Sequence, residues 1–175
     1  MREIVAVTVG LRSGMASEVL PLTADLPTRQ LDPGEVLYDQ GDESGAGIAV
    51  LVDGLLRIEL EDMVISEIGA PGSFIGEIGA LLRVPRTAQV VAVEPSTVRL
   101  ISDPDALFSS HPELALELAR QLAGRLNRLL AYLGDVRTQY RDEGGHLAVL
   151  DSVLGKLATR APVEIEPGSD RSPDY

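Results

Sequence analysis

Residues 48–68 read IAVLVDGLLRIELEDMVISEI and contain three apolar runs separated by turn residues. The first run, Ile48 to Val52, is continuously apolar and reads as a strand. The second, Leu55 to Leu60, alternates apolar and charged side chains over most of its length, which is typical of a half-buried strand. Asp53-Gly54 between them is a strong signal for a two-residue hairpin, and another reversal precedes Val64 to Ile68. The segment therefore predicts three consecutive antiparallel strands.

Further short strands are expected on both sides of this segment. Val36 to Tyr38 follows the turn Asp32-Pro33-Gly34, and Thr87 to Val93 and Thr97 to Ile101 flank Glu94-Pro95-Ser96. Short apolar runs with Gly and Pro turns about every eight to twelve residues indicate a β-barrel or a β-sandwich.

The apolar period becomes helical in the last third of the chain. Asp103-Pro104 opens a short helix, and Ser110 to Glu113 has the S-x-x-E form of a capping box before a long helix. The apolar stripe of this long helix consists of Leu114, Leu118, Leu122, Leu126, Leu129 and Leu133. The predicted fold class is mostly β with α: an antiparallel β-roll, or jelly-roll-like barrel, with flanking helices and a long C-terminal helix.

The predicted domain organisation has four parts. Residues 1–26 form an N-terminal segment, and residues 27–143 form the main domain, including its C-terminal helix. Residues 144–160 form a shorter accessory helix. Residues 161–175 carry three prolines and several charges with little to bury, so we expect a disordered tail.

Composition excludes several kinds of site. The 175 residues include no cysteine and two histidines, His111 and His146, which excludes disulfides, thiolate sites and a multi-histidine metal cluster. The start of the chain resembles neither a signal peptide nor a membrane span, so we expect a cytoplasmic protein. The net charge of −12 disfavours nucleic acid and membranes as partners. An anionic ligand would therefore need a locally positive site.

Residues 74–88 read FIGEIGALLRVPRTA and carry the residues most suited to binding chemistry. Their glycines allow the backbone to approach a ligand closely. Glu77 to Leu82 predicts a short helix, whose first N–H groups could bind a phosphate. Arg86, just after the helix-ending Pro85, offers a planar fork of donors to the same phosphate. Glu77 beside a phosphate is best explained as an acceptor for a sugar hydroxyl, as in dinucleotide sites.

Two runs in this segment resemble the phosphate-binding cassette of cyclic-nucleotide-binding domains: Gly76 to Leu81 and Pro85 to Ala88. Such domains occur in the catabolite activator protein, the regulatory subunit of protein kinase A and cyclic-nucleotide-gated channels. Pro33 to Asp42 and Ile48 to Gly54 resemble the family's early strands and turns, so the resemblance covers Leu26 to Val136. We refer to residues 76–88 as the cassette.

The resemblance implies a role for each cassette residue. Glu77 would accept a hydrogen bond from the ribose 2′-hydroxyl, and Arg86 would pair with the cyclic phosphate of cAMP or cGMP. The sugar-phosphate would be lined by the backbone of Gly76, Ile78, Gly79, Thr87 and Ala88. Thr87 could add its hydroxyl, but it does not decide between the two bases. No metal and no cofactor besides the nucleotide are expected.

In this family the long C-terminal helix usually closes over the base, and in several members it dimerises. Tyr132 is the aromatic candidate for stacking on the purine, with Leu129 and Val136 as alternatives. The leucine stripe could pack on its own domain or on a second copy of the chain, so a homodimer through this helix is possible.

The main functional prediction is a stand-alone regulatory module, not an enzyme, in which cAMP or cGMP changes the position of the C-terminal helices. One alternative is an interaction or dimerisation module with a vestigial pocket. Another is a fragment of a transcription regulator, although the acidic chain has no basic recognition helix. A metal-dependent cupin would need a cluster of histidine and carboxylate ligands.

Overall fold

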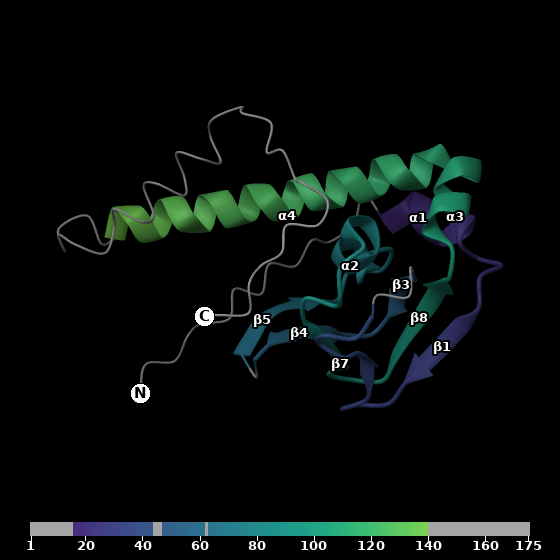
Figure 1. Cartoon of the computed structure of the whole chain (residues 1–175), viewed down its shortest axis with the longest axis horizontal. Helices are drawn as coiled ribbons and strands as arrows, with labels where there is room; N and C mark the ends of the chain where they lie inside the picture. Colours follow the sequence, from purple (N-terminus) through teal and green to yellow (C-terminus); the bar gives the residue numbers. More distant parts are fainter. Residues whose placement is uncertain (1–15, 44–46, 62, 140–175) are drawn as a thin grey trace. The chain divides into compact units, whose positions relative to one another are not determined.

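The computed structural model describes residues 16–43, 47–61 and 63–139, in which eight strands form two four-stranded antiparallel sheets (Figure 1). The strands are β1 (Thr28–Leu31), β2 (Val36–Tyr38), β3 (Ile48–Asp53), β4 (Leu56–Leu60), β5 (Met63–Ile68), β6 (Phe74–Ile75), β7 (Gln89–Ala92) and β8 (Ser96–Ile101). The helices are α1 (Ala16–Leu22), α2 (Glu77–Leu82), α3 (Pro104–Ser110) and α4 (Pro112–Gln139). The predicted jelly-roll-like fold is confirmed, as two sheets without a closed barrel among these strands.

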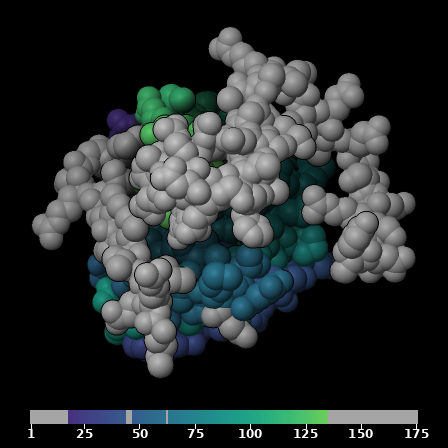
Figure 2. Space-filling view, turned by 90° about the vertical axis from the view of Figure 1, so that its left-hand side faces the viewer, coloured from purple at the N-terminus to yellow at the C-terminus, as the bar shows by residue number. Residues whose placement is uncertain are grey.

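The strand order shows how the chain alternates between the two sheets. One sheet has the order β1-β8-β3-β6 and the other β2-β7-β4-β5. Consecutive strands β3 and β4 therefore lie in different sheets, as do β7 and β8. The β4–β5 pair forms a true hairpin, in which Leu60 lies opposite Met63, so the predicted reversal there is confirmed. The β4–β5 end of the sheets, in blue, faces the viewer in Figure 2.

The hairpin predicted at Asp53-Gly54 is wrong, because β3 and β4 do not pair with each other. Gly54 has φ +102°, and a Cβ on it would lie 2.6 Å from Ser96 Cα. The Leu55 N–H donates to Ser96 Oγ at 3.1 Å. The turn thus packs against the start of β8 and carries the chain from one sheet to the other.

Strand β3 lies between two apolar cores and contributes side chains to both. Ala49 and Leu51 belong to the core between the sheets, whereas Ile48 and Val50 belong to a core covered by helices. Because successive side chains of a strand point to opposite faces, a strand between two cores must be apolar throughout. The predicted apolar strand over Ile48 to Val52 is therefore confirmed, and the structure shows that it is buried on both faces at these four positions.

The junction between α3 and α4 differs from the predicted capping box. Helix α3 starts at Pro104, as expected, and Asp103 caps it, because its Oδ1 accepts from the Ala106 N–H at 2.9 Å. Ser110 is the last residue of α3, and its hydroxyl donates back to the carbonyls of Ala106 and Leu107 at 3.0 Å. The Ser110 side chain is engaged by its own helix, and α4 begins only at Pro112.

Helix α4 belongs to both compact units of the chain, whose boundary falls between Ala123 and Gly124. In the first unit, Leu114 and Leu118 are buried in the helix-covered core. The Gln121 side chain accepts from the Phe74 N–H at 3.1 Å and donates to the Gly72 carbonyl at 2.9 Å. The start of α4 is thereby attached to β6 and to the loop before it.

Among the residues of α4 in the second unit whose burial is described, the large apolar side chains that are exposed are Leu126, Leu129 and Tyr132. No helix within the described ranges is long and apolar enough to cross a membrane. The expected accessory helix and tail lie outside the described residues, and the predicted domain boundaries stay a prediction.

Candidate functional site

The cassette begins where β6 ends. Gly76 follows β6 with φ +79°, a left-handed conformation that favours glycine, and α2 starts at the next residue. The helix ends at Leu82, and the Arg83 N–H caps it by donating to the Gly79 carbonyl. The short helix predicted at Glu77 to Leu82 is therefore confirmed.

Arg86 is a buried cation held from several sides. Its Nη1 donates to the Gly76 carbonyl and its Nη2 to the Gly47 carbonyl, each at 2.7 Å. Its own peptide group is bonded to the loop after β2: the N–H donates to Asp42 O and the carbonyl accepts from the Gly41 N–H, both at 2.8 Å. Only 7% of Arg86 is exposed. The chain thus places a fixed positive charge inside a protein of net charge −12.

The ring of Tyr38, at the end of β2, packs against one face of the Arg86 guanidinium. The Arg86 Cζ lies 3.9 Å from the centre of the Tyr38 ring. Burial raises the pKa of Tyr38 above its ordinary value of 10.0, the Arg86 charge opposes that rise, and the Glu77 carboxylate adds to it. Arg86 Nη1 donates to the carbonyl of Gly76, the residue directly before Glu77, so Glu77 and Arg86 lie in the same neighbourhood.

Glu77 is the first residue of α2, and only 2% of it is exposed. A carboxylate is retained at such a buried position only where charges or hydrogen-bond donors compensate the loss of water. With Arg86 it gives the site one buried negative and one buried positive group, beside the backbone of Gly76 and Gly79.

The other predicted ligand residues are placed around these two. Ile78 is exposed on α2, whereas Gly79 is buried in it; Thr87 is exposed and Ala88 half-buried between Arg86 and β7. Tyr132 lies in the second unit and is 60% exposed, so its predicted stacking on the base stays a prediction.

Arg83, which flanks the cassette helix in sequence, does not share the burial of Arg86. Its side chain is 87% exposed and lies 3.9 Å from Asp105. Exposed ion pairs of this kind contribute little to stability. Of the two arginines in the cassette, Arg86 is therefore the one that is built into the fold.

Sequence reasoning missed Tyr38 and Gly47, which complete the surroundings of Arg86. The chain has only four Tyr and two Phe, so an aromatic residue at the end of a predicted strand was a usable signal. The contribution of Gly47 is a backbone carbonyl, which any residue carries, and no sequence pattern could have identified it.

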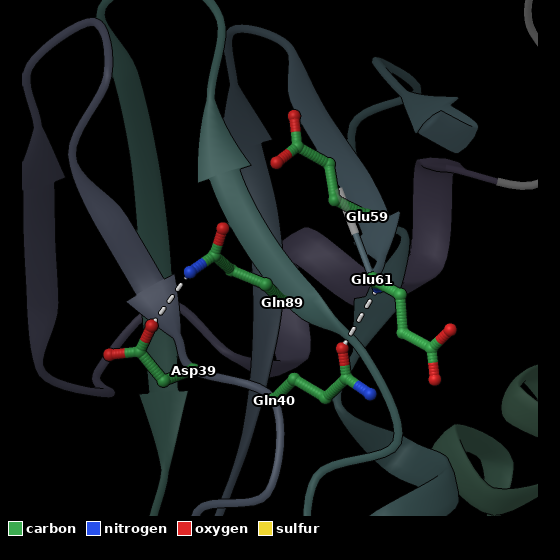
Figure 3. Close-up of a pocket in the computed structure, with 5 residues that line it drawn as sticks. All are labelled: Asp39, Gln40, Glu59, Glu61 and Gln89. Carbon is green, nitrogen blue, oxygen red and sulfur yellow. Dashed lines mark hydrogen bonds between the residues drawn. The ribbon is translucent and has the colours of Figure 1, made fainter. Parts of the chain in front are cut away.

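A separate hollow on the β4 side of the molecule has the wrong charge for a phosphate (Figure 3). It is lined by Asp39, Gln40, Glu59, Glu61 and Gln89. Within it Gln89 donates to Asp39 at 2.7 Å and the Glu61 N–H donates to Gln40 at 3.1 Å. Nor do the described residues contain three His, Asp or Glu side chains placed to hold a metal ion. Of these two places, the cassette is the one with a cation.

Comparison with known proteins identifies the family of the domain that contains the cassette. Residues 28–107 match the family model of the cyclic nucleotide-binding domain. Lysophospholipase NTE1 of Cryptococcus neoformans var. neoformans serotype D is 35% identical over 139 residues, which is 74% of this chain and 8% of that protein. Lysophospholipase nte1 of Aspergillus oryzae is 31% identical over 133 residues, which is 71% of this chain and again 8% of that protein. The chain thus spans a small part of these relatives.

Solved structures share the fold. One, described as "A cyclic-GMP-dependent signalling pathway regulates bacterial phytopathogenesis", is 25% identical with a TM-score of 0.54, covering 64% of this chain and 94% of its own. The catabolite activator protein of Thermus thermophilus is 23% identical with a TM-score of 0.55, covering 79% and 76%. Fold, cassette and family match agree: residues 28–107 form a domain of the cyclic nucleotide-binding family.

Proposed function

We propose that this domain binds cAMP or cGMP through the cassette and acts as a regulatory module without catalysis of its own. The observation that carries the proposal is the pair of buried, oppositely charged side chains, Glu77 and Arg86, beside glycine backbone. A cyclic nucleotide offers a hydroxyl donor, which a carboxylate can accept from, and an anionic phosphate, which a guanidinium can bind.

Arg86 is the proposed phosphate ligand. Guanidinium groups bind phosphate oxygens through short, charge-assisted hydrogen bonds. The two carbonyl contacts and the Tyr38 ring hold this guanidinium in place, so little side-chain freedom is lost when a ligand binds. Glu77 is the proposed acceptor for the ribose 2′-hydroxyl, and the backbone of Ile78, Gly79, Thr87 and Ala88 completes the cradle.

The proposed output is a change in the position of the C-terminal helices. Gln121 supports a connection, because it attaches the start of α4 to the strand that leads into Gly76 and Glu77. A ligand shifts such an equilibrium only by its differential affinity for the two positions. That the module acts alone stays a prediction from the sequence, since the relatives carry this domain as 8% of a larger protein.

A homodimer through α4 is a further part of the proposal. Leu126 and Leu129 lie three residues apart on the helix and are exposed, together with Tyr132. Apolar residues at this spacing are typical of helix–helix contacts. Light scattering with and without nucleotide tests this directly, and a monomer at all concentrations in both states contradicts it.

The binding proposal is tested by calorimetric titration with cAMP and with cGMP, followed by Arg86→Ala. Loss of a charge-assisted contact costs about 1.5–3 kcal/mol, or about ten- to over a hundredfold in affinity. Arg83→Ala is the matched control, because this neighbouring arginine is exposed, and it should retain the wild-type affinity within about threefold.

Each negative outcome has a separate meaning. If neither nucleotide gives heat or a melting shift at millimolar concentration, the ligand proposal fails and the vestigial-pocket alternative takes its place. If binding occurs but Arg86→Ala retains it, the function stands and the assigned site is wrong.

A further inference from the structure

Tyr38 lies outside the cassette, forty-eight residues before Arg86 in the sequence, yet its ring contacts the proposed phosphate ligand directly. We propose that Tyr38 is a positioning residue that fixes the Arg86 guanidinium for the phosphate of a cyclic nucleotide and thereby sets the affinity of the site. This inference rests on the proposed function and adds a residue to its binding site.

The contact between the two side chains is a cation–π interaction of close geometry. Arg86 Cζ lies 3.9 Å from the centre of the ring, well within the distance of about 6 Å over which such pairs attract. Arg86 is buried, and the attraction is largest where the cation has lost its water. The ring therefore contributes more here than it would at the surface.

The ring and the two carbonyls constrain different parts of the guanidinium. The edges donate to Gly76 O and Gly47 O, while Tyr38 covers a face. A rotation of the guanidinium plane would break the edge contacts, and a translation away from the ring would lose the face contact. Together they define one orientation for the cation.

Gly76 shows how tightly this arrangement is packed. A Cβ on Gly76 would lie 2.6 Å from Arg86 Nη1 and 2.8 Å from Tyr38 Cε2. The space beside the Gly76 Cα is thus bounded by both Arg86 and Tyr38 and holds a hydrogen atom but no methyl group. The observed position of the Arg86 side chain therefore depends on both Gly76 and Tyr38.

The backbone holds Tyr38 and Arg86 in register independently of their side chains. Tyr38 lies opposite Val90 in the β2–β7 pair, and the loop after β2 exchanges two backbone hydrogen bonds with Arg86 through Gly41 and Asp42. Replacing the ring should therefore leave the Arg86 backbone in place and release only its side chain. Burial keeps the pKa of Tyr38 above 10.0, so the ring is neutral at physiological pH.

The test is a set of substitutions at position 38 with calorimetric titration of cAMP and cGMP. Tyr38→Leu removes the π face and keeps an apolar side chain, and it should weaken binding about five- to thirtyfold. Tyr38→Phe, the conservative variant, should restore most of the affinity. Phe108→Leu is the matched control, because this aromatic residue packs against Phe74 in the other core and should alter stability but not affinity.

Two measurements separate positioning from a merely structural role. In a double-mutant cycle, Tyr38→Leu should have no further effect on affinity once Arg86 is replaced by alanine. Fluorinated phenylalanines at position 38 keep the shape of the ring and weaken its π face, so affinity should fall with each added fluorine. If Tyr38→Leu does not fold, the fluorinated series still tests whether the π face of the ring contributes to affinity.

The inference fails if Tyr38→Leu costs the same affinity with and without Arg86, or if fluorination has no effect. A ligand-free measurement distinguishes this failure from that of the proposed function. In NMR spectra the Arg86 side-chain protons should show ring-current shifts that disappear in Tyr38→Leu. If these shifts occur but the wild type binds neither nucleotide, the positioning is upheld and the proposed function is refuted; if they are absent, the positioning is refuted.

Discussion

Replacing Gly76 by alanine tests the packing of the cassette most directly. Gly76 has φ +79°, and an L residue in the left-handed region costs about 1–2 kcal/mol. The new Cβ would also lie 2.6 Å from Arg86 Nη1, so the guanidinium has to move and its 2.7 Å bond to the Gly76 carbonyl is strained or lost. A hydrogen bond to a charged group contributes about 1.5–3 kcal/mol. We expect Gly76→Ala to lower the free energy of unfolding by about 2.5–5 kcal/mol, the sum of these two effects.

Gly34→Ala supplies the control for backbone strain alone. Gly34 has φ +86°, almost the same conformation, but a Cβ there would meet no atom within 4 Å. It should therefore lower the free energy of unfolding by only about 1–2 kcal/mol and leave nucleotide affinity unchanged. The difference between the two variants isolates the displacement of Arg86.

The assay combines urea unfolding, followed by circular dichroism, with calorimetric titration of each variant. Gly76→Ala should weaken nucleotide binding about tenfold or more, approaching the loss in Arg86→Ala. The reasoning is refuted if the two glycine variants agree within about 0.5 kcal/mol in stability and also agree in affinity, because the expected clash with Arg86 would then have no consequence.

Two further predictions concern stability. Hydrogen bonds from Arg29 and from the Asp32 N–H hold the pKa of Glu35 below its ordinary value of 4.5. The stability that this contributes is present above pH 4.5 and is lost as the pH falls through the lowered pKa; Glu35→Gln should remove that part of the pH dependence in acid titrations of the urea midpoint. Gln121→Ala should lower the free energy of unfolding by about 1–3 kcal/mol, since it removes two hydrogen bonds to backbone; a change below about 0.5 kcal/mol in urea unfolding would contradict this.

Local patterns predicted the strands and the cassette helix well, because each depends on side chains close together in sequence. The continuous apolar run of Ile48 to Val52 indicated a strand, and Asp103-Pro104 indicated the start of a helix. The turn at Asp53-Gly54 was mispredicted because its outcome depends on Ser96, which lies on another strand. A dipeptide signal cannot distinguish a turn within one sheet from a turn between two.

In the candidate site, too, features that depend on neighbouring residues could be predicted, and contacts between residues distant in sequence could not. Glu77 and Arg86 could be proposed as ligand-binding residues from residue type and spacing. Tyr38 could not be connected to Arg86, since their contact depends on the pairing of β2 with β7 and on the loop at Gly41. The pairing of strands that are distant in sequence, and not local propensity, brings the Tyr38 ring against Arg86.

The side-chain amide of Gln121 attaches α4 to β6, and it also affects how exposed the edge of the sheet is. Strand β6 is the outer strand of its sheet, and an outer strand exposes backbone donors and acceptors that can recruit another chain. Gln121 accepts from the Phe74 N–H and donates to the Gly72 carbonyl, as a neighbouring strand would. A motion of α4 that breaks both bonds would uncover a site for edge-to-edge aggregation. The part of α4 that carries Gln121 therefore covers this strand edge, and a variant that loses both hydrogen bonds should be more prone to edge-to-edge aggregation.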